Sequence, residues 1–377
     1  MRQKRLKIII LLYIFCFIFF GGFGQSISSA ELKMMKVLNS ASNAVPEDLL
    51  LSKSIVIISM GDGESTVRGD WKTLSEEAHF YIKKLSIDAV LYFYIDDIIA
   101  GYDVQRAIAQ QMIDRDIKNI LMLSKDKING RDQFISVLTP FNKEPTFMSN
   151  NQAAWKSQTS DLEILFRNLS RSIDNADLTL ENLLIIDSPE YYRGSDIIRG
   201  GRFETLNTDL RIDKLAVPKF VDLPTTEDLS VASSTEMVSL INSENTKNLQ
   251  RNAQLEQLMV NYPYQYEIIP YEYDEKKLLT KGFQFVLMRI NSSGRNVRKL
   301  LGYGVSEHND ELITVKKDYL GEVSVKSIPM DAMVFKYYIK HLNSGDVYLG
   351  EQWDGDDIWQ DALNNHMSSI IEKLEKR

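Results

Sequence analysis

The stretch VFKYYIKHLNSGDVYLGEQW, residues 334–353, decides the fold. Two apolar runs flank Asn343–Asp346, and a Gly with Asn and Asp favours the tight turn of a β-hairpin. A helical pattern follows up to Arg377. Earlier, QFISVLTPFNKEPTFMSNNQAAW, residues 133–155, also predicts a strand pair, here around Asn-Lys-Glu, and a helix follows at 161–173. The chain therefore predicts one α/β unit that occurs twice.

The residues that precede each strand pair support this interpretation. Apolar β-branched runs predict strands and 3.6-residue periodicity predicts helices. Asp70 and Asp103 are expected to cap the first two helices, because a carboxylate accepts from the free N–H groups of a first turn. Gly282 is expected to end a later helix. The expected order before the first strand pair is strand 54–60, helix 71–85, strand 89–95, helix 104–116 and strand 119–123. In the second copy it is strand 182–186, helix 248–260, strand 265–271, helix 274–281 and strand 283–290.

The predicted fold class is α/β, with two similar units of a sheet and packed helices. The alternative is that two unrelated α/β halves share this coarse pattern. The polar segment 222–246 is interpreted as an exposed loop or linker because it has few large apolar residues. The predicted division is a signal peptide at 1–24, a flexible lead-in at 25–50, a first α/β domain at 51–178, and a second at 179–377 with insertions at 188–247 and 302–331.

The amino-terminal segment has the layout of a secretory signal peptide. Four basic residues precede an apolar run at 8–20, and Gly22 and Gly24 offer small residues for cleavage. The run is about 13 residues, shorter than the ~20 that span a bilayer. We therefore expect a periplasmic or secreted protein; the alternative is an uncleaved anchor, which alone would associate the chain with a membrane. The single cysteine, Cys16, lies inside this run rather than after it, which argues against lipidation.

The second copy resembles a known group of envelope domains, the α/β units of the TolB amino-terminal and curli-secretion (CsgG) type. Phe285-Val286-Leu287 stands at the strand that often reads "dyvl" in that group, and Asn343–Asp346 stands at its Gly-containing hairpin turn. The resemblance covers 267–377 best and 54–173 more loosely. It implies a periplasmic binding or assembly module without catalysis, with envelope proteins as partners. The long insertions and the lack of a lipidated cysteine depart from the group.

Acidic residues follow several predicted strands and are the candidate catalytic residues. They are Asp96, Asp97, Asp126 and Asp187. Carboxyl ends of parallel strands line one edge of a sheet, where ligands bind, and carboxylates there could hold Mg²⁺ or Ca²⁺. The competing interpretation is that they are solvated turn residues and helix caps, and no metal site or cofactor is predicted. The alternative function is a metal-dependent hydrolase or nucleotide-binding enzyme at these positions.

Two further features are candidates for ligand binding. GDGESTVRGDWK, residues 61–72, joins a strand to a helix as a phosphate loop does, but it lacks the Gly-Lys-Ser/Thr that reaches phosphates. Arg68 or Lys72 would have to replace that lysine, which nothing in the pattern favours; the competing interpretation is a polar loop capped by Asp70. The Tyr-rich segment 262–273 predicts a contact surface, since a tyrosine ring buries much area for little entropy; packing inside the fold is the alternative. Its candidate binding residues are Tyr264, Tyr266, Tyr271 and Tyr273.

Charge and composition exclude some functions. The formal net charge is −8 and no basic stripe occurs, which argues against nucleic acid as a partner. The four histidines form no close pair, so zinc is not predicted. The sequence therefore predicts a non-catalytic binding or assembly module of the bacterial cell envelope.

Overall fold

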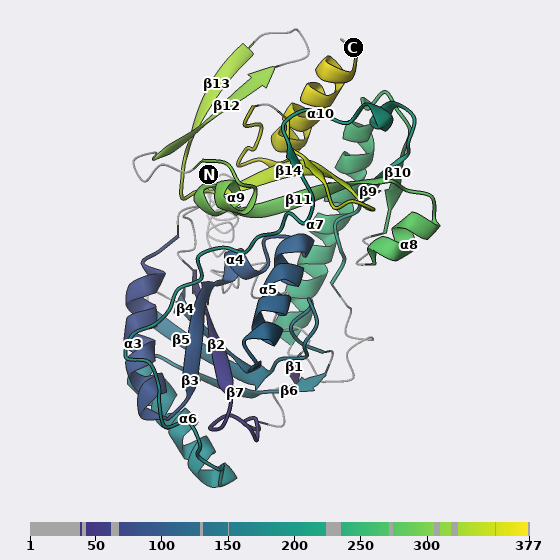
Figure 1. Ribbon diagram of the computed structural model, residues 1–377. Coiled ribbons are helices and arrows are strands. Elements are labelled where there is room, and N and C mark those ends of the chain that lie inside the picture. Colours follow the sequence, from purple (N-terminus) through teal and green to yellow (C-terminus); the bar gives the residue numbers. More distant parts are fainter. Residues whose placement is uncertain are drawn as a thin grey trace, which may run out of the picture.

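The computed structural model describes most of the chain after residue 42 (Figure 1). The predicted signal peptide, Tyr271, Tyr273 and the loop after strand 54–60 lie outside the described residues. Within them, no helix is both long and apolar enough to cross a membrane. The described residues are 38–39, 43–61, 68–128, 131–149, 151–223, 235–270, 274–304, 310–317, 323–350 and 352–375.

The first unit is a five-stranded sheet with helices on both faces. The strand order is β3-β2-β4-β5-β7, with β2 parallel to β3 and β4, and with β5 antiparallel to β4 and β7. Successive β2 side chains point to opposite faces: Val56 and Ile58 pack against α3 and α6, whereas Ile55 and Ile57 pack against α5. The elements are β2 (Lys53–Gly61), α3 (Trp71–Lys84), β3 (Asp88–Tyr94), α4 (Ile95–Ile98), α5 (Tyr102–Asp114), β4 (Ile117–Ile128), β5 (Arg131–Pro140), β7 (Trp155–Thr159) and α6 (Leu162–Ala176). A two-residue strand pair, β1 (Leu38–Asn39) and β6 (Gln152–Ala153), lies beside it.

The second unit is a six-stranded sheet in the order β10-β9-β11-β14-β15-β8. Phe285 and Leu287 face α7 and α10, and Val286 and Met288 face the first unit. The elements are β8 (Arg202–Phe203), a 3-10 turn η2 (Thr208–Arg211), β9 (Leu215–Pro218), α7 (Thr235–Met259), β10 (Tyr266–Ile269), α8 (Glu275–Thr280), β11 (Phe285–Ser293), α9 (Gly294–Leu300), β14 (Met333–His341), β15 (Val347–Tyr348) and α10 (Trp359–Glu375).

Apart from the additional strand β8, the two sheets have the same strand order and the same strand directions. In each unit the first strand lies between the second and third and is parallel to both, and the fourth and fifth strands are antiparallel additions. The second unit adds α9 and an antiparallel hairpin, β12 (Glu311–Lys317) with β13 (Val323–Pro329), between its third and fourth strands. The hairpin extends away from both sheets (Figure 1).

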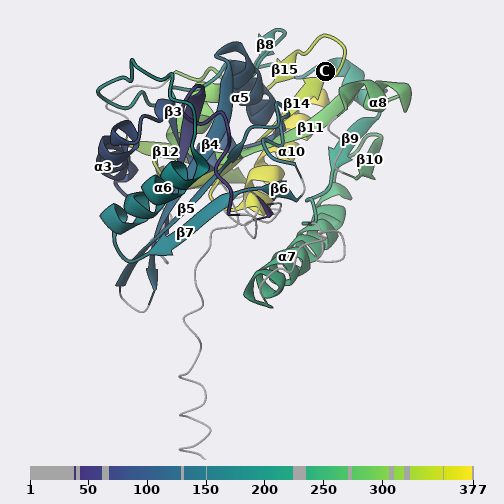
Figure 2. The same ribbon diagram turned by 90° about the horizontal axis from the view of Figure 1, so that it is seen from below.

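One hydrophobic core joins the two units. It contains residues of β2, β3 and α5 together with residues of β11, β14 and α8. The sheet face covered by α5 in the first unit and the sheet face covered by α8 in the second unit therefore point toward each other. Helix α5 lies at this boundary (Figures 1 and 2). Gly101, which precedes α5, lies so close to β11 that a Cβ would come within 2.7 Å of the Arg289 carbonyl oxygen.

Several local predictions are confirmed. Asp70 accepts a hydrogen bond from the Thr73 N–H at the start of α3. Gly282 follows α8 with φ +86°, and Gly345 has φ +75° in the turn between β14 and β15, the left-handed region that favours glycine.

Other local predictions are wrong. Residues 182–186 form no strand; the first strand of the second unit is β9 instead. Residues 235–246 belong to α7 rather than to a loop. The first strand pair does not turn at Asn142–Glu144, because β5 pairs with β4 and then with β7, and residues 145–149 form no strand. Asp103 does not cap α5: Gly101 occupies that position, and the Asp103 side chain is buried between the units.

Candidate functional site

The carboxyl end of β3 carries a buried charge network in place of an open acidic site. Asp97, on α4, accepts two hydrogen bonds from the Arg68 guanidinium at 2.8 and 2.6 Å. Its Oδ1 also accepts from the Ser292 hydroxyl at 2.8 Å and from the Asn296 amide at 2.7 Å. Burial alone would lower the pKa of Arg68, but the charge and hydrogen bonds of Asp97 outweigh it and the pKa is raised.

This network links the two units. Ser292 lies at the end of β11 and Asn296 on α9, whereas Asp97 and Arg68 flank α3 and β3. Asp97 is 8 % exposed and Ser292 is fully buried. A carboxylate with four donors around it is held as a structural anion, since its oxygens are already occupied by fixed partners.

The four predicted acidic residues do not converge. Asp97 lies on α4 after β3, and Asp126 lies on β4; strand β2 separates β3 from β4 in the sheet. Asp126 is buried opposite Gly61, and Asp96 is half-buried on α4. Asp187 is exposed and pairs with Lys83 in the last turn of α3, whereas Arg68 precedes the first turn of that helix. In the described part of the chain no three His, Cys, Asp or Glu side chains are grouped so that they could hold a metal ion.

The described part of the Tyr-rich segment packs against the fold. Tyr262 is buried, and its ring meets the rings of Tyr264 at 5.6 Å and Tyr266 at 6.0 Å in edge-on contacts. Tyr264 and Tyr266 are half-buried against the core beneath α7 and α10. Burial raises the pKa of Tyr262. These rings therefore keep only part of their surface for a partner.

Sequence reasoning missed a set of buried charges on β14. Lys336 is 0 % exposed and Lys340 is 1 % exposed. They are four residues apart on β14 and lie on the face of the strand that points toward the first unit. Lys340 donates to Asp103 at 2.8 Å and to Glu275 at 2.8 Å. The signal was present in the sequence, because lysines inside the apolar run MVFKYYIKH require buried anions.

The anion beside Lys336 is Asp354. Its carboxylate lies 2.5 Å from the Lys336 ammonium and accepts from His366 at 2.9 Å. Burial alone would raise the pKa of Asp354, but the charges of Lys336 and His366 and their hydrogen bonds lower it. Burial also lowers the pKa of Lys336 and of His366. All three side chains are fully or nearly fully buried, which makes the group part of the core.

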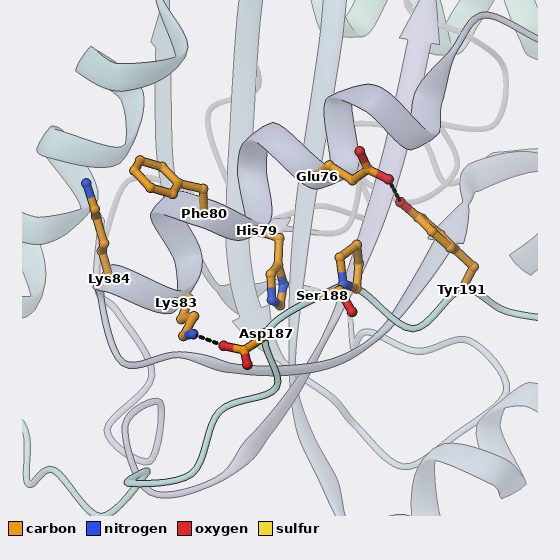
Figure 3. A pocket seen from close by; sticks show the side chains of 9 residues that line it. Glu76, His79, Phe80, Lys83, Lys84, Asp187, Ser188 and Tyr191 are labelled. Atoms are coloured by element: carbon orange, nitrogen blue, oxygen red, sulfur yellow. Dashed lines mark hydrogen bonds and ion pairs between the residues drawn. The ribbon is translucent and has the colours of Figure 1, made fainter.

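The surface is hollowed between α3 and the extended segment 187–191. We call this hollow the α3 groove (Figure 3); it has a volume of about 710 Å³. Its floor is His79, whose Nδ1 hydrogen-bonds the Tyr92 hydroxyl at 2.7 Å and whose Nε2 hydrogen-bonds the Ile186 carbonyl at 3.0 Å. The lining residues are Glu76, His79, Phe80, Lys83, Lys84, Asp187, Ser188, Pro189 and Tyr191.

Comparisons with known proteins add no relative. No family model, no curated protein and no solved structure matches the chain. The resemblance to TolB amino-terminal and curli-secretion domains therefore remains a prediction.

Proposed function

We propose that the chain is a tandem duplication of one α/β unit and serves as a non-catalytic binding or assembly module of the bacterial envelope, outside the cytoplasm. The observation that carries the proposal is the Asp97 network: this strand-end acid is surrounded by four donors, two from Arg68 in its own unit and two from Ser292 and Asn296 in the other unit. The common strand order of the two sheets supports the duplication.

The β12–β13 hairpin supplies a contact surface for such a module. One face packs inward through Leu312 and Ile328, while Ile313, Val323 and Val325 on the other face are 53 %, 63 % and 67 % exposed. Exposed β-branched residues side by side on a projecting two-stranded sheet are typical of interaction sites. The hairpin occupies one of the two regions that the sequence identified as insertions.

Cross-linking in intact envelopes tests the proposal. The wild-type chain should capture a specific protein, and Val323→Asp with Val325→Asp should abolish the capture. Val260→Asp is the matched control, since Val260 is 74 % exposed outside the hairpin and its substitution should leave capture unchanged. Equal capture by all variants would contradict the role of the hairpin. Metal-dependent hydrolase activity that Asp97→Asn abolishes in a folded protein would overturn the non-catalytic assignment.

A further inference from the structure

The α3 groove has the chemical features of a small-ligand site that is independent of the proposed assembly role. Aromatic side chains mark its two ends: Phe80, 55 % exposed, lies beside Lys84 at one end and Tyr191 lies at the other, with His79 between them (Figure 3). Tyr191 is fixed there, because its hydroxyl lies 3.2 Å from the Lys72 carbonyl and 3.5 Å from the Glu76 carboxylate, and its backbone bridges to Tyr92 (Figure 3). Burial raises the pKa of Tyr191 to about 12, so the ring remains neutral.

Hydrogen bonds close the floor of the groove. His79 is 2 % exposed and both ring nitrogens have partners, so the floor offers a ligand contact area rather than a free donor or acceptor. Burial raises the pKa of its partner Tyr92, which keeps the phenol protonated. The polar selectivity of the groove must therefore come from its rim.

The rim at the carboxyl end of α3 is cationic but already holds an anion. Lys83 and Lys84 lie on the last turn, and the Lys84 ammonium sits 3.8 Å from the centroid of the Phe80 ring. The Asp187 carboxylate, 92 % exposed, pairs with Lys83 from the extended segment (Figure 3). The Asp187 carboxylate is therefore already paired with the Lys83 ammonium that an anionic ligand would bind.

We propose that the α3 groove binds a small amphipathic anion, an apolar ring that carries a carboxylate or sulfonate, and that the Asp187 carboxylate is an internal occupant that the ligand's anionic group displaces from Lys83. The ring of the ligand lies between Phe80 and Tyr191, over His79. Exposed ion pairs contribute little stability, so the Lys83–Asp187 pair exchanges readily. The pKa of Asp187 is lowered by the hydrogen bond and charge of Lys83, so acid releases the pair only below the usual range of an aspartate.

The test uses two fluorescent probes with the full-length chain. 8-Anilinonaphthalene-1-sulfonate carries the ring and the anion, and N-phenyl-1-naphthylamine carries the ring alone. Asp187→Asn removes the internal competitor and should tighten sulfonate binding about two- to fivefold, with no change for the neutral probe. Asp116→Asn is the matched control, because Asp116 makes an exposed pair with Lys118 elsewhere and its loss should change neither affinity.

Two further variants separate the ring from the anion. Lys83→Met should weaken the sulfonate probe about threefold or more and leave the neutral probe unchanged, whereas Phe80→Ser should weaken both. Probe bound at the N-terminal apolar run or at the β12–β13 hairpin contributes equally in every variant and cancels in the comparison. The proposal is overturned if the wild type shows no saturable site, if Phe80→Ser and Lys83→Met leave sulfonate binding unchanged, or if Asp187→Asn does not differ from Asp116→Asn. None of these outcomes depends on the capture of an envelope partner.

Discussion

Asp103 offers the sharpest test of how the two units are held together. Its carboxylate is 2 % exposed and accepts from Lys340 at 2.8 Å, Arg106 at 2.9 Å and the Tyr338 hydroxyl at 2.9 Å. Glu275 completes the group, which thus contains two acids and two bases. Asp103→Asn preserves the shape and an acceptor for Tyr338, but it leaves the buried group with an uncompensated positive charge.

The expected cost follows from that imbalance. Removing one partner of a buried ion pair costs about 3–5 kcal/mol, a large part of the ~5–15 kcal/mol that stabilises a typical domain. In Asp103→Asn with Lys340→Met the group is neutral again, because Arg106 and Glu275 still pair at 2.8 Å. The double variant should therefore be more stable than Asp103→Asn alone, by about 1–2 kcal/mol.

Urea unfolding followed by far-ultraviolet circular dichroism measures both effects. Asp116→Asn, which breaks an exposed pair, is the control and should leave the unfolding midpoint unchanged. The reasoning is refuted if Asp103→Asn unfolds at the wild-type midpoint, or if the double variant is less stable than the single one.

Three further predictions concern the core and the surface. Burial lowers the pKa of His366 in the folded state below its unfolded value of about 6.5. The stabilising contribution of the neutral His366 is therefore fully present above about pH 6.5 and is lost as the pH falls toward the folded-state pKa. His366→Asn should make the unfolding free energy less dependent on pH, as measured by urea unfolding at a series of pH values. Asn252 accepts from the Phe220 N–H at 2.7 Å and donates to its carbonyl at 3.0 Å, so Asn252→Ala should cost about 1–3 kcal/mol of unfolding free energy, whereas exposed Asn242→Ala should change it little. Leu184 is 94 % exposed, so Leu184→Lys should leave the melting temperature unchanged; a large drop would indicate a buried strand at this position.

Local sequence signals predicted the elements whose pattern agrees with their burial. The β-branched run of β2 is buried on both faces, and the glycine in the turn after β14 adopts the left-handed backbone that its position requires. The same apolar signal failed at 182–186, because two leucines there are exposed instead of packed. Strand β9 was missed because it spans only four residues and ends in a proline.

The roles of the acidic residues could not be predicted, because their partners are distant in sequence. Asp97 is paired with Ser292 and Asn296, and Asp103 with Lys340, across the boundary between the units. Spacing along the chain identifies the carboxylates but not the donors that the fold brings to them. The two lysines inside β14 were the one local sign that buried acids existed.

The central claim is that the strand-end carboxylate Asp97 is a structural anion that its pairing with Arg68 holds in place. A double-mutant cycle with Arg68→Met and Asp97→Asn, measured by urea unfolding, tests this claim most directly. The two side chains are 14 % and 11 % exposed and share two hydrogen bonds, so we predict a coupling free energy of about 1–3 kcal/mol. A coupling near zero, with stability unchanged in Asp97→Asn, would contradict the claim.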